Sequence, residues 1–180
     1  MALLLYAGAV LWALYRVQWI ELLADNRRQH LLFGSMFMLA VLWLVRRDFD
    51  NGLTFHFIGL TAVTLLLNWQ LAIVAGTLAQ LGMLVIGWDD AAAFGVNGIL
   101  RVLLPVAVTL MVSRGLEHFK PGNLFMYIFI SGFFAAGLCG VVTILAGMGL
   151  LAWSAELAMP AAPFEVIGFL LLAAFPEAFI

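Results

Sequence analysis

The most constraining feature of the sequence is a run of 35 residues, 53–87, in which His56 is the only acidic or basic side chain. As one straight α-helix this run would be about 52 Å long, whereas the hydrocarbon core of a bilayer is roughly 30 Å thick. The only polar cluster inside the run is Asn-Trp-Gln at 68–70. We therefore predict two short helices, 53–67 and 71–87, with a turn at the membrane interface between them and with His56 at the head of the first.

The composition of the whole chain is that of a membrane protein. Hydrophobic residues make up 66% of its 180 residues and charged residues only 10%, whereas soluble domains are about 45–50% apolar. The formal net charge of −2 provides no basic surface for nucleic acid. The single cysteine, Cys139, excludes an intrachain disulfide and a metal site built from cysteines. We predict a single integral membrane domain over residues 1–180, with lipid around it and no nucleic-acid partner.

Apolar segments of about the length of a membrane span recur along the rest of the chain. Besides the two short helices, the predicted spans are 2–23, 30–45, 94–113, 124–152 and 164–180. The predicted fold is therefore all-α, a polytopic transmembrane helix bundle of about six to seven spans. Gly132, Ala136 and Gly140 follow one another at intervals of four residues and so share one helix face. Small residues at this spacing predict close approach by another helix.

The distribution of basic residues predicts the orientation, because Lys and Arg are enriched in cytoplasmic loops. With seven spans and the N-terminus outside, the cytoplasmic side holds Arg16, Arg27, Arg28, Arg114 and Lys120. If the two short helices merged, every later loop would change sides. In the seven-span topology, His56, the N-terminus and the start of the segment 94–113 all lie near the outer face of a bacterial inner membrane.

No sequence motif indicates an enzyme. The chain contains no phosphate-binding Gly-rich loop, no His-Glu-x-x-His and no Gly-x-Ser-x-Gly. Because it has no means of hydrolysing ATP, uphill transport would need a partner protein or an ion gradient as its source of energy. We predict no catalytic residues and no resident cofactor.

Ionisable side chains within apolar spans are costly and are therefore candidates for function. Arg101 is predicted either to pair with a carboxylate, which could be Asp89, Asp90 or Glu177, or to act in gating or substrate passage. Glu177, near the end of the last apolar segment, is predicted to be a helix-end or interface carboxylate or a functional group.

His56 is a candidate metal ligand, because neutral imidazole binds nickel, cobalt, copper and zinc well. The alternative is a buried histidine that is hydrogen-bonded to a carbonyl or hydroxyl group. One histidine alone makes a poor site. The predicted topology brings further candidate ligands to it: Asn97, Asp89, Asp90, Thr54 and the terminal amine of Met1.

The stretch "FHFIGLTAVTLLLNWQLAIVAGTLAQLGMLVIG", followed by "AAFGVNGIL", resembles the CbiM-like family, the membrane permeases of energy-coupling-factor cobalt/nickel transporters. The matching residues are His56, Gly59, Asn68-Trp69 and the Phe-Gly-Val-Asn sequence at 94–97. A divergent proteobacterial branch is more similar still. It shares the motifs that this chain has as "NLFMYIF" at 123–129, "GFF" at 132–134 and "FPEAF" at 175–179.

The resemblance implies a membrane subunit that binds a divalent transition metal, Co or Ni, as its substrate. In the family the ligands are the N-terminal amine, a histidine at position two and the histidine that matches His56, and the partners are a coupling protein and ABC-type ATPases. Because Ala2 replaces that second histidine, the predicted metal site consists of His56, Asn97 and Met1. The alternative is a non-transporting accessory or structural subunit of a larger membrane complex.

Overall fold

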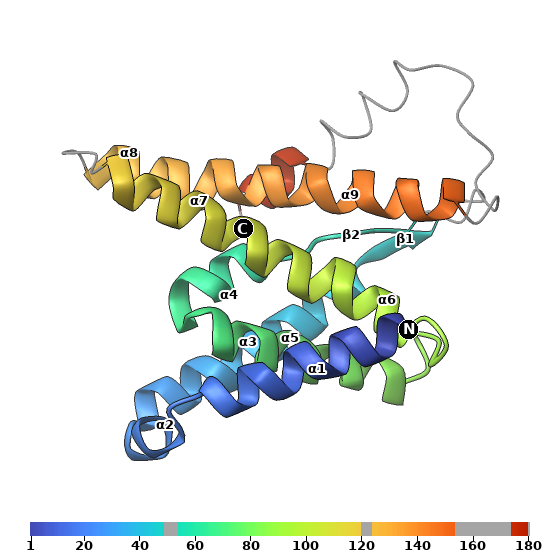
Figure 1. Ribbon diagram of the computed structural model, residues 1–180, viewed down its shortest axis with the longest axis horizontal. Coiled ribbons are helices and arrows are strands. Elements are labelled where there is room, and N and C mark those ends of the chain that lie inside the picture. The colour runs from blue at the N-terminus through green and yellow to red at the C-terminus, as the bar shows by residue number, and fades with distance from the viewer. Residues whose placement is uncertain (49–53, 120–123, 154–173, 180) are drawn as a thin grey trace.

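The computed structural model describes residues 1–48, 54–119, 124–153 and 174–179. Helices and one short β-hairpin account for most of these residues (Figure 1). The elements are α1 (Ala2–Arg16), α2 (Trp19–Ala24), α3 (Asn26–Leu44), β1 (Arg46–Asp48), β2 (Thr54–His56), α4 (Leu60–Leu67), α5 (Trp69–Val85), α6 (Phe94–Gly98), α7 (Leu104–Phe119), α8 (Leu124–Ile128) and α9 (Ala135–Trp153). Two π-helical segments, Ile99–Leu103 and Phe129–Phe134, continue α6 into α7 and α8 into α9.

The predicted break in the run 53–87 is confirmed, and it falls on a single residue. Asn68 separates α4 from α5 with a φ of 71° and a ψ of 162°, a sparsely populated conformation that is costly for a residue with a side chain. The helix before the break is shorter than predicted, because it begins at Leu60 rather than at residue 53. The prediction that His56 lies at the head of a helix is therefore wrong.

His56 lies instead on a strand. β2 pairs antiparallel with β1, and Arg46 lies opposite His56 in the register. The prediction of an all-α fold misses this hairpin. After β2 the chain continues without regular secondary structure to Gly59, where a φ of 67° turns it into α4. The extended conformation of this segment is possible because β1 and distant side chains supply its hydrogen bonds.

Two of the described helices are long and apolar enough to cross a membrane, Phe94–Leu116 with 23 residues and Phe129–Leu150 with 22. Two further helices, α1 and α5, are apolar but shorter. Large apolar side chains are exposed on the surfaces of these helices, as expected for an integral membrane protein. The number of spans, six to seven, stays a prediction, and residues 164–173 of the last predicted span lie outside the described residues.

The first predicted span, 2–23, is divided in the structure. α1 ends at Arg16, and the short α2 follows at Trp19. Side chains on α2 such as Ile20 are exposed, while the Trp19 indole N–H donates to the carbonyl of Leu14 at 3.0 Å. A short helix with an exposed apolar face and a tryptophan suits the membrane interface better than the hydrocarbon core.

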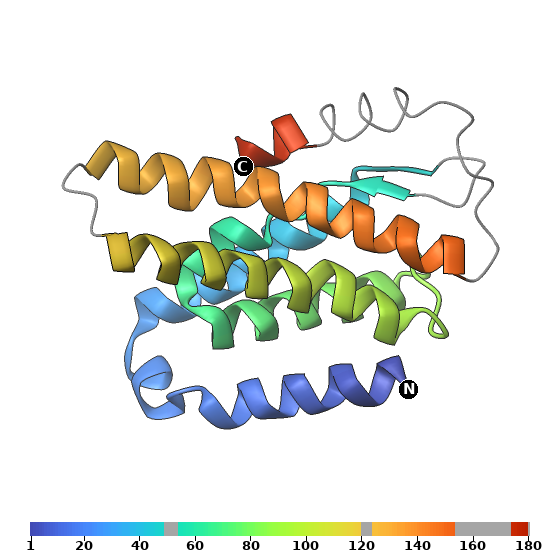
Figure 2. The same cartoon turned by 45° about the horizontal axis from the view of Figure 1, so that its top comes forward.

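Helix α5 forms the centre of the bundle and packs against α1, α3 and α4, while α7 and α9 run side by side above it (Figure 2). The predicted interface of small residues is present over part of its length. Ala136 is buried, and a Cβ built on Gly140 would lie 3.7 Å from Ala174 of the chain's own C-terminal helical turn, residues 174–178. A Cβ at Gly132 would meet no atom within 4 Å, so the interface does not extend that far.

Candidate substrate-binding site

The N-terminus of the chain lies directly on α6. A Cβ built on Gly95 would lie 2.5 Å from the backbone of Leu3, and one built on Gly98 would collide with the ring of Tyr6. Tyr6 is buried and shares a hydrogen bond of 2.8 Å with the hydroxyl of Thr77 on α5. The two glycines therefore permit α1 to dock closely, so that Ala2 and Leu3 lie against α6, and the 97% exposed Met1 precedes them.

Replacing Gly98 with alanine is expected to lower the free energy of unfolding by about 1–3 kcal/mol, the usual cost of overpacking. The added methyl group would displace the Tyr6 ring, which is fixed by its bond to Thr77. The matched control is Gly8→Ala on α1, where a Cβ meets nothing within 4 Å. Thermal unfolding in detergent measures the stability of both variants. Equal stability of the two would contradict the close docking of α1 on α6.

A cluster of charged residues connects the β-hairpin to the segment that precedes α6. The side chain of Asp89 is only 3% exposed. Its carboxylate forms ion pairs with the guanidinium groups of Arg46, at 3.3 Å, and Arg101, at 2.6 Å. Arg46 also donates to the carbonyl of Trp88 at 2.9 Å and stacks over its ring. The prediction that Arg101 pairs with a carboxylate is confirmed. Since Arg46 lies opposite His56, the cluster also fixes the strand that carries the histidine.

The same cluster removes Asp89 from the candidate ligands, and the turn beside it engages Asp90. Both carboxylate oxygens of Asp89 accept hydrogen bonds from arginines, and a third charge of the same sign, a metal cation, would be repelled there. One carboxylate oxygen of Asp90 accepts the backbone N–H of Ala92 at 2.9 Å and stabilises the turn. Asp89 is therefore unsuited to bind a metal, whereas Asp90 is exposed and has a structural role in the turn.

The structure brings the elements of two of the predicted metal ligands together, since α1 packs on α6, and connects the strand of the third to the turn before α6 through Arg46 and Asp89. Met1 precedes α1, Asn97 lies on the partly buried α6, and His56 ends β2 (Figure 1). The side chains of His56 and Thr54 lie outside the described residues. Among the described residues, no three His, Cys, Asp or Glu side chains form a group that could hold a metal. A site here would depend on one imidazole together with the main-chain amine and an amide.

Glu177 is buried and binds the backbone just beyond β2. Its carboxylate accepts the N–H of Ile58 at 2.7 Å and that of Gly59 at 2.8 Å, and the residue is 3% exposed. The sequence marked Glu177 as a helix-end or functional carboxylate but contained no sign of its partners, which lie more than 110 residues away along the chain. The two backbone N–H groups that Glu177 binds lie at the start of α4.

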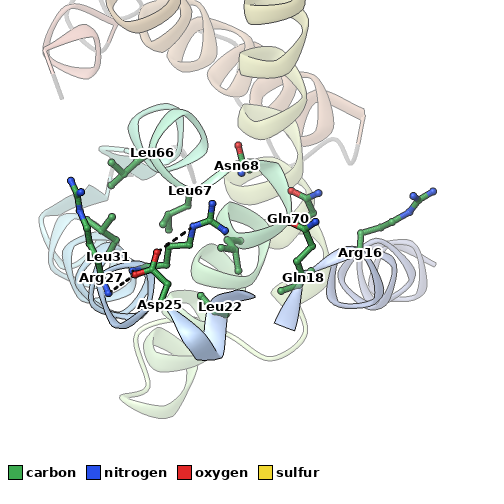
Figure 3. Close-up of a pocket in the computed structure, with 13 residues that line it drawn as sticks. Arg16, Gln18, Leu22, Asp25, Arg27, Leu31, Leu66, Leu67, Asn68 and Gln70 are labelled. Carbon is green, nitrogen blue, oxygen red and sulfur yellow. Dashed lines mark hydrogen bonds and ion pairs between the residues drawn. The ribbon is translucent and has the colours of Figure 1, made fainter. Parts of the chain in front are cut away.

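A pocket of about 270 Å³ opens where α1, α2, α3 and the α4–α5 break meet. Figure 3 shows Asn68 and Gln70 across the pocket from Asp25, with the side chain of Arg16 directed away. Arg28 in the lining pairs with Glu21 at 3.3 Å and Asp25 at 3.8 Å. Sequence reasoning missed this pocket, because its lining comes from four separate elements. Its three arginines make it unsuitable for a metal cation.

The apolar helices with large exposed hydrophobic side chains, and the buried charges that connect the hairpin to the segment before α6, are those of an integral membrane protein. The chain belongs to the CbiM family: the family model described as the cobalt uptake substrate-specific transmembrane region matches residues 1–180. The resemblance found in the sequence is therefore confirmed.

The fold is similar to that of a known crystal structure, described as a truncated transition metal transporter. The TM-score is 0.70 at 17% sequence identity, and the alignment covers 99% of this chain and 88% of that chain. At this identity the likeness establishes the fold. No curated protein sequence matches the chain.

Proposed function

We propose that this protein is the membrane subunit that binds a divalent transition metal of the cobalt or nickel type and admits it to a transport complex. The observation that carries the proposal is the docking of α1 on Gly95 and Gly98, which brings the N-terminal residues against α6, the helix of Asn97, while Arg46 and Asp89 connect the strand of His56 to the turn before that helix. The family membership supports the same substrate.

The proposed ligands are the imidazole of His56, the terminal amine of Met1 and the side-chain oxygen of Asn97. Imidazole and amine nitrogens suit late first-row metals, and the amide oxygen would complete a mixed nitrogen and oxygen set. Three ligands leave positions for water, so metal binding would be reversible, as a transport subunit requires. The metal would be the substrate rather than a resident cofactor.

The proposed orientation places the proposed site at the outer face of a bacterial inner membrane. The arginines that line the pocket in Figure 3 would then face the cytoplasm, in agreement with the enrichment of basic residues on that side. Because the sequence contains no ATP-binding motif, we propose that a coupling membrane protein and ABC-type ATPases supply the energy at the cytoplasmic face.

The test is a metal titration of the purified protein with Co(II), Ni(II), Cu(II) and Zn(II), followed by competition with a chelator. We expect one saturable site that His56→Ala abolishes. The matched control is His30→Ala, because His30 lies on α3 and its ring is bonded to the carbonyl of Asn26 at 2.7 Å. Absence of saturable binding, or equal binding by the wild type and His56→Ala, would overturn the proposal.

A second candidate function is that of a non-transporting subunit of a larger membrane complex. It is favoured by Ala2, which stands where the resemblance implies a metal-binding histidine. Under this function, purification in mild detergent would yield a stoichiometric assembly without an ABC-type ATPase, and the metal titration would show no saturable site. Copurification with such an ATPase would exclude it.

A further inference from the structure

The segment between β2 and α4 brings polar backbone groups into the interior of the bundle. Residues 57–59 have no regular secondary structure, and Ile58 is only 4% exposed. In Figure 1 the chain leads here from the hairpin toward the middle of the molecule, where α4 begins. Hydrocarbon offers no hydrogen bonds, so non-helical backbone at membrane depth must find its partners within the protein.

Two side chains from distant parts of the sequence provide those partners. Each carboxylate oxygen of Glu177 accepts one N–H, from Ile58 at 2.7 Å and from Gly59 at 2.8 Å. The carbonyl of Ile58 accepts the indole N–H of Trp43 on α3 at 3.1 Å. Hydrogen bonds to an ionised carboxylate are among the stronger ones in proteins, and a negative charge is favourable at the N-terminus of α4.

Glu177 is itself held in place by α9. The C-terminal turn, residues 174–178, packs against α9: a Cβ built on Gly140 would lie 3.6 Å from Cγ of Glu177, and one built on Gly137 would lie 3.7 Å from the carbonyl oxygen of Ala174. The turn therefore lies against this face of α9, and from there the carboxylate reaches the end of α4. The carboxylate thus connects two helices to the segment that follows β2.

His56 lies two residues before Ile58, between two fixed points. On one side its strand pairs with Arg46, which Asp89 and Trp88 hold. On the other side the next peptides are held by Glu177. We propose that Glu177 is a positioning residue for the substrate site: it fixes the end of β2 so that the imidazole of His56 meets the metal in the correct place. This inference rests on the proposed function.

The test compares two substitutions that make the same chemical change. Glu177→Gln replaces one of the two accepting oxygens with an NH₂ group, which faces a backbone donor and cannot accept from it. Asp25→Asn is the control for the loss of a carboxylate charge, because Asp25 accepts the N–H groups of Arg27 and Arg28 at the start of α3 on one oxygen, Oδ1, which the asparagine amide keeps. The measurements are the Kd for Co(II) and the visible d–d absorption of the bound ion, at a temperature where circular dichroism shows both variants to be folded.

We expect Glu177→Gln to weaken Co(II) binding by about 10- to 100-fold, the usual effect of removing a group that orients a metal ligand. We also expect it to change the d–d bands, whereas Asp25→Asn should alter Kd by less than about twofold. Glu177→Asp keeps both oxygens on a shorter stem and should recover part of the affinity. If Glu177→Gln does not fold, Glu177→Asp takes its place, with an expected Kd between those of the wild type and His56→Ala.

Two results would overturn the positioning role while leaving the proposed function in place. The first is a Kd and spectrum for Glu177→Gln equal to those of the wild type, while His56→Ala abolishes binding. The second is an equal loss of affinity in Asp25→Asn, which would show that removing a carboxylate charge at another helix start has the same effect. If the wild type shows no saturable Co(II) binding, the proposed function fails, and the positioning role fails with it.

Discussion

Replacing Asp89 with alanine is expected to lower the free energy of unfolding by about 3–5 kcal/mol, the usual cost of breaking a buried ion pair. The side chain of Asp89 is 3% exposed, and it neutralises Arg101, which is 11% exposed, and Arg46, which is 19% exposed. Without the carboxylate, two guanidinium groups of like charge would remain close together and largely out of water. The loss should depend little on salt, since buried charges are weakly screened.

The neighbouring carboxylate provides the control for this prediction. Asp90 is exposed and accepts only the backbone N–H of Ala92, so Asp90→Ala should lower the free energy of unfolding by about 0.5–2 kcal/mol, the range for lost capping bonds. Thermal unfolding in detergent, or unfolding in increasing SDS, measures both variants. An equal loss in the two would show that Asp89 acts only as a turn residue and that the arginines find other partners.

The sequence alone predicted the main break in the fold correctly. A run of 35 apolar residues cannot cross the bilayer as one helix, and the polar residue Asn68 falls where the chain turns. The sequence also restricted the partner of Arg101 to three carboxylates, and one of these, Asp89, is the partner in the structure. Both predictions depend on a cost that is visible locally, namely excess length or a charge among apolar residues.

The β-hairpin could not be predicted in the same way. Arg46 and Arg47 looked like loop charges, and the Thr-Phe-His of β2 looked like the start of an apolar helix. The strand forms because contacts from elsewhere satisfy the extended backbone: β1 pairs with β2, and Glu177 and Trp43 bind Ile58. Each of these partners lies in a segment whose own pattern gives no indication of the contact.

Changing Ala2 to histidine is expected to strengthen Co(II) and Ni(II) binding by about 100-fold, equivalent to about 2.7 kcal/mol. Ala2 is half-buried at the first position of α1, beside Gly95. An imidazole there would add a second aromatic nitrogen ligand next to the terminal amine, restoring the set that the family resemblance implies. Imidazole binds nickel more tightly than an amide oxygen does, because it is the better donor for late first-row metals.

The experiment compares Ala2→His, Ala2→Gln and the double variant Ala2→His/His56→Ala by chelator competition. Ala2→Gln adds a polar side chain of similar length without an imidazole and should bind metal as the wild type does. If the two histidines share one ion, the double variant should lose most of the gain, because the new imidazole is then the only one beside the amine and the amide of Asn97. A gain that persists without His56 would place the new site at the N-terminus alone. Unchanged affinity in Ala2→His would show that Met1 lies too far from His56 to share its metal, and would exclude the terminal amine from the proposed ligand set.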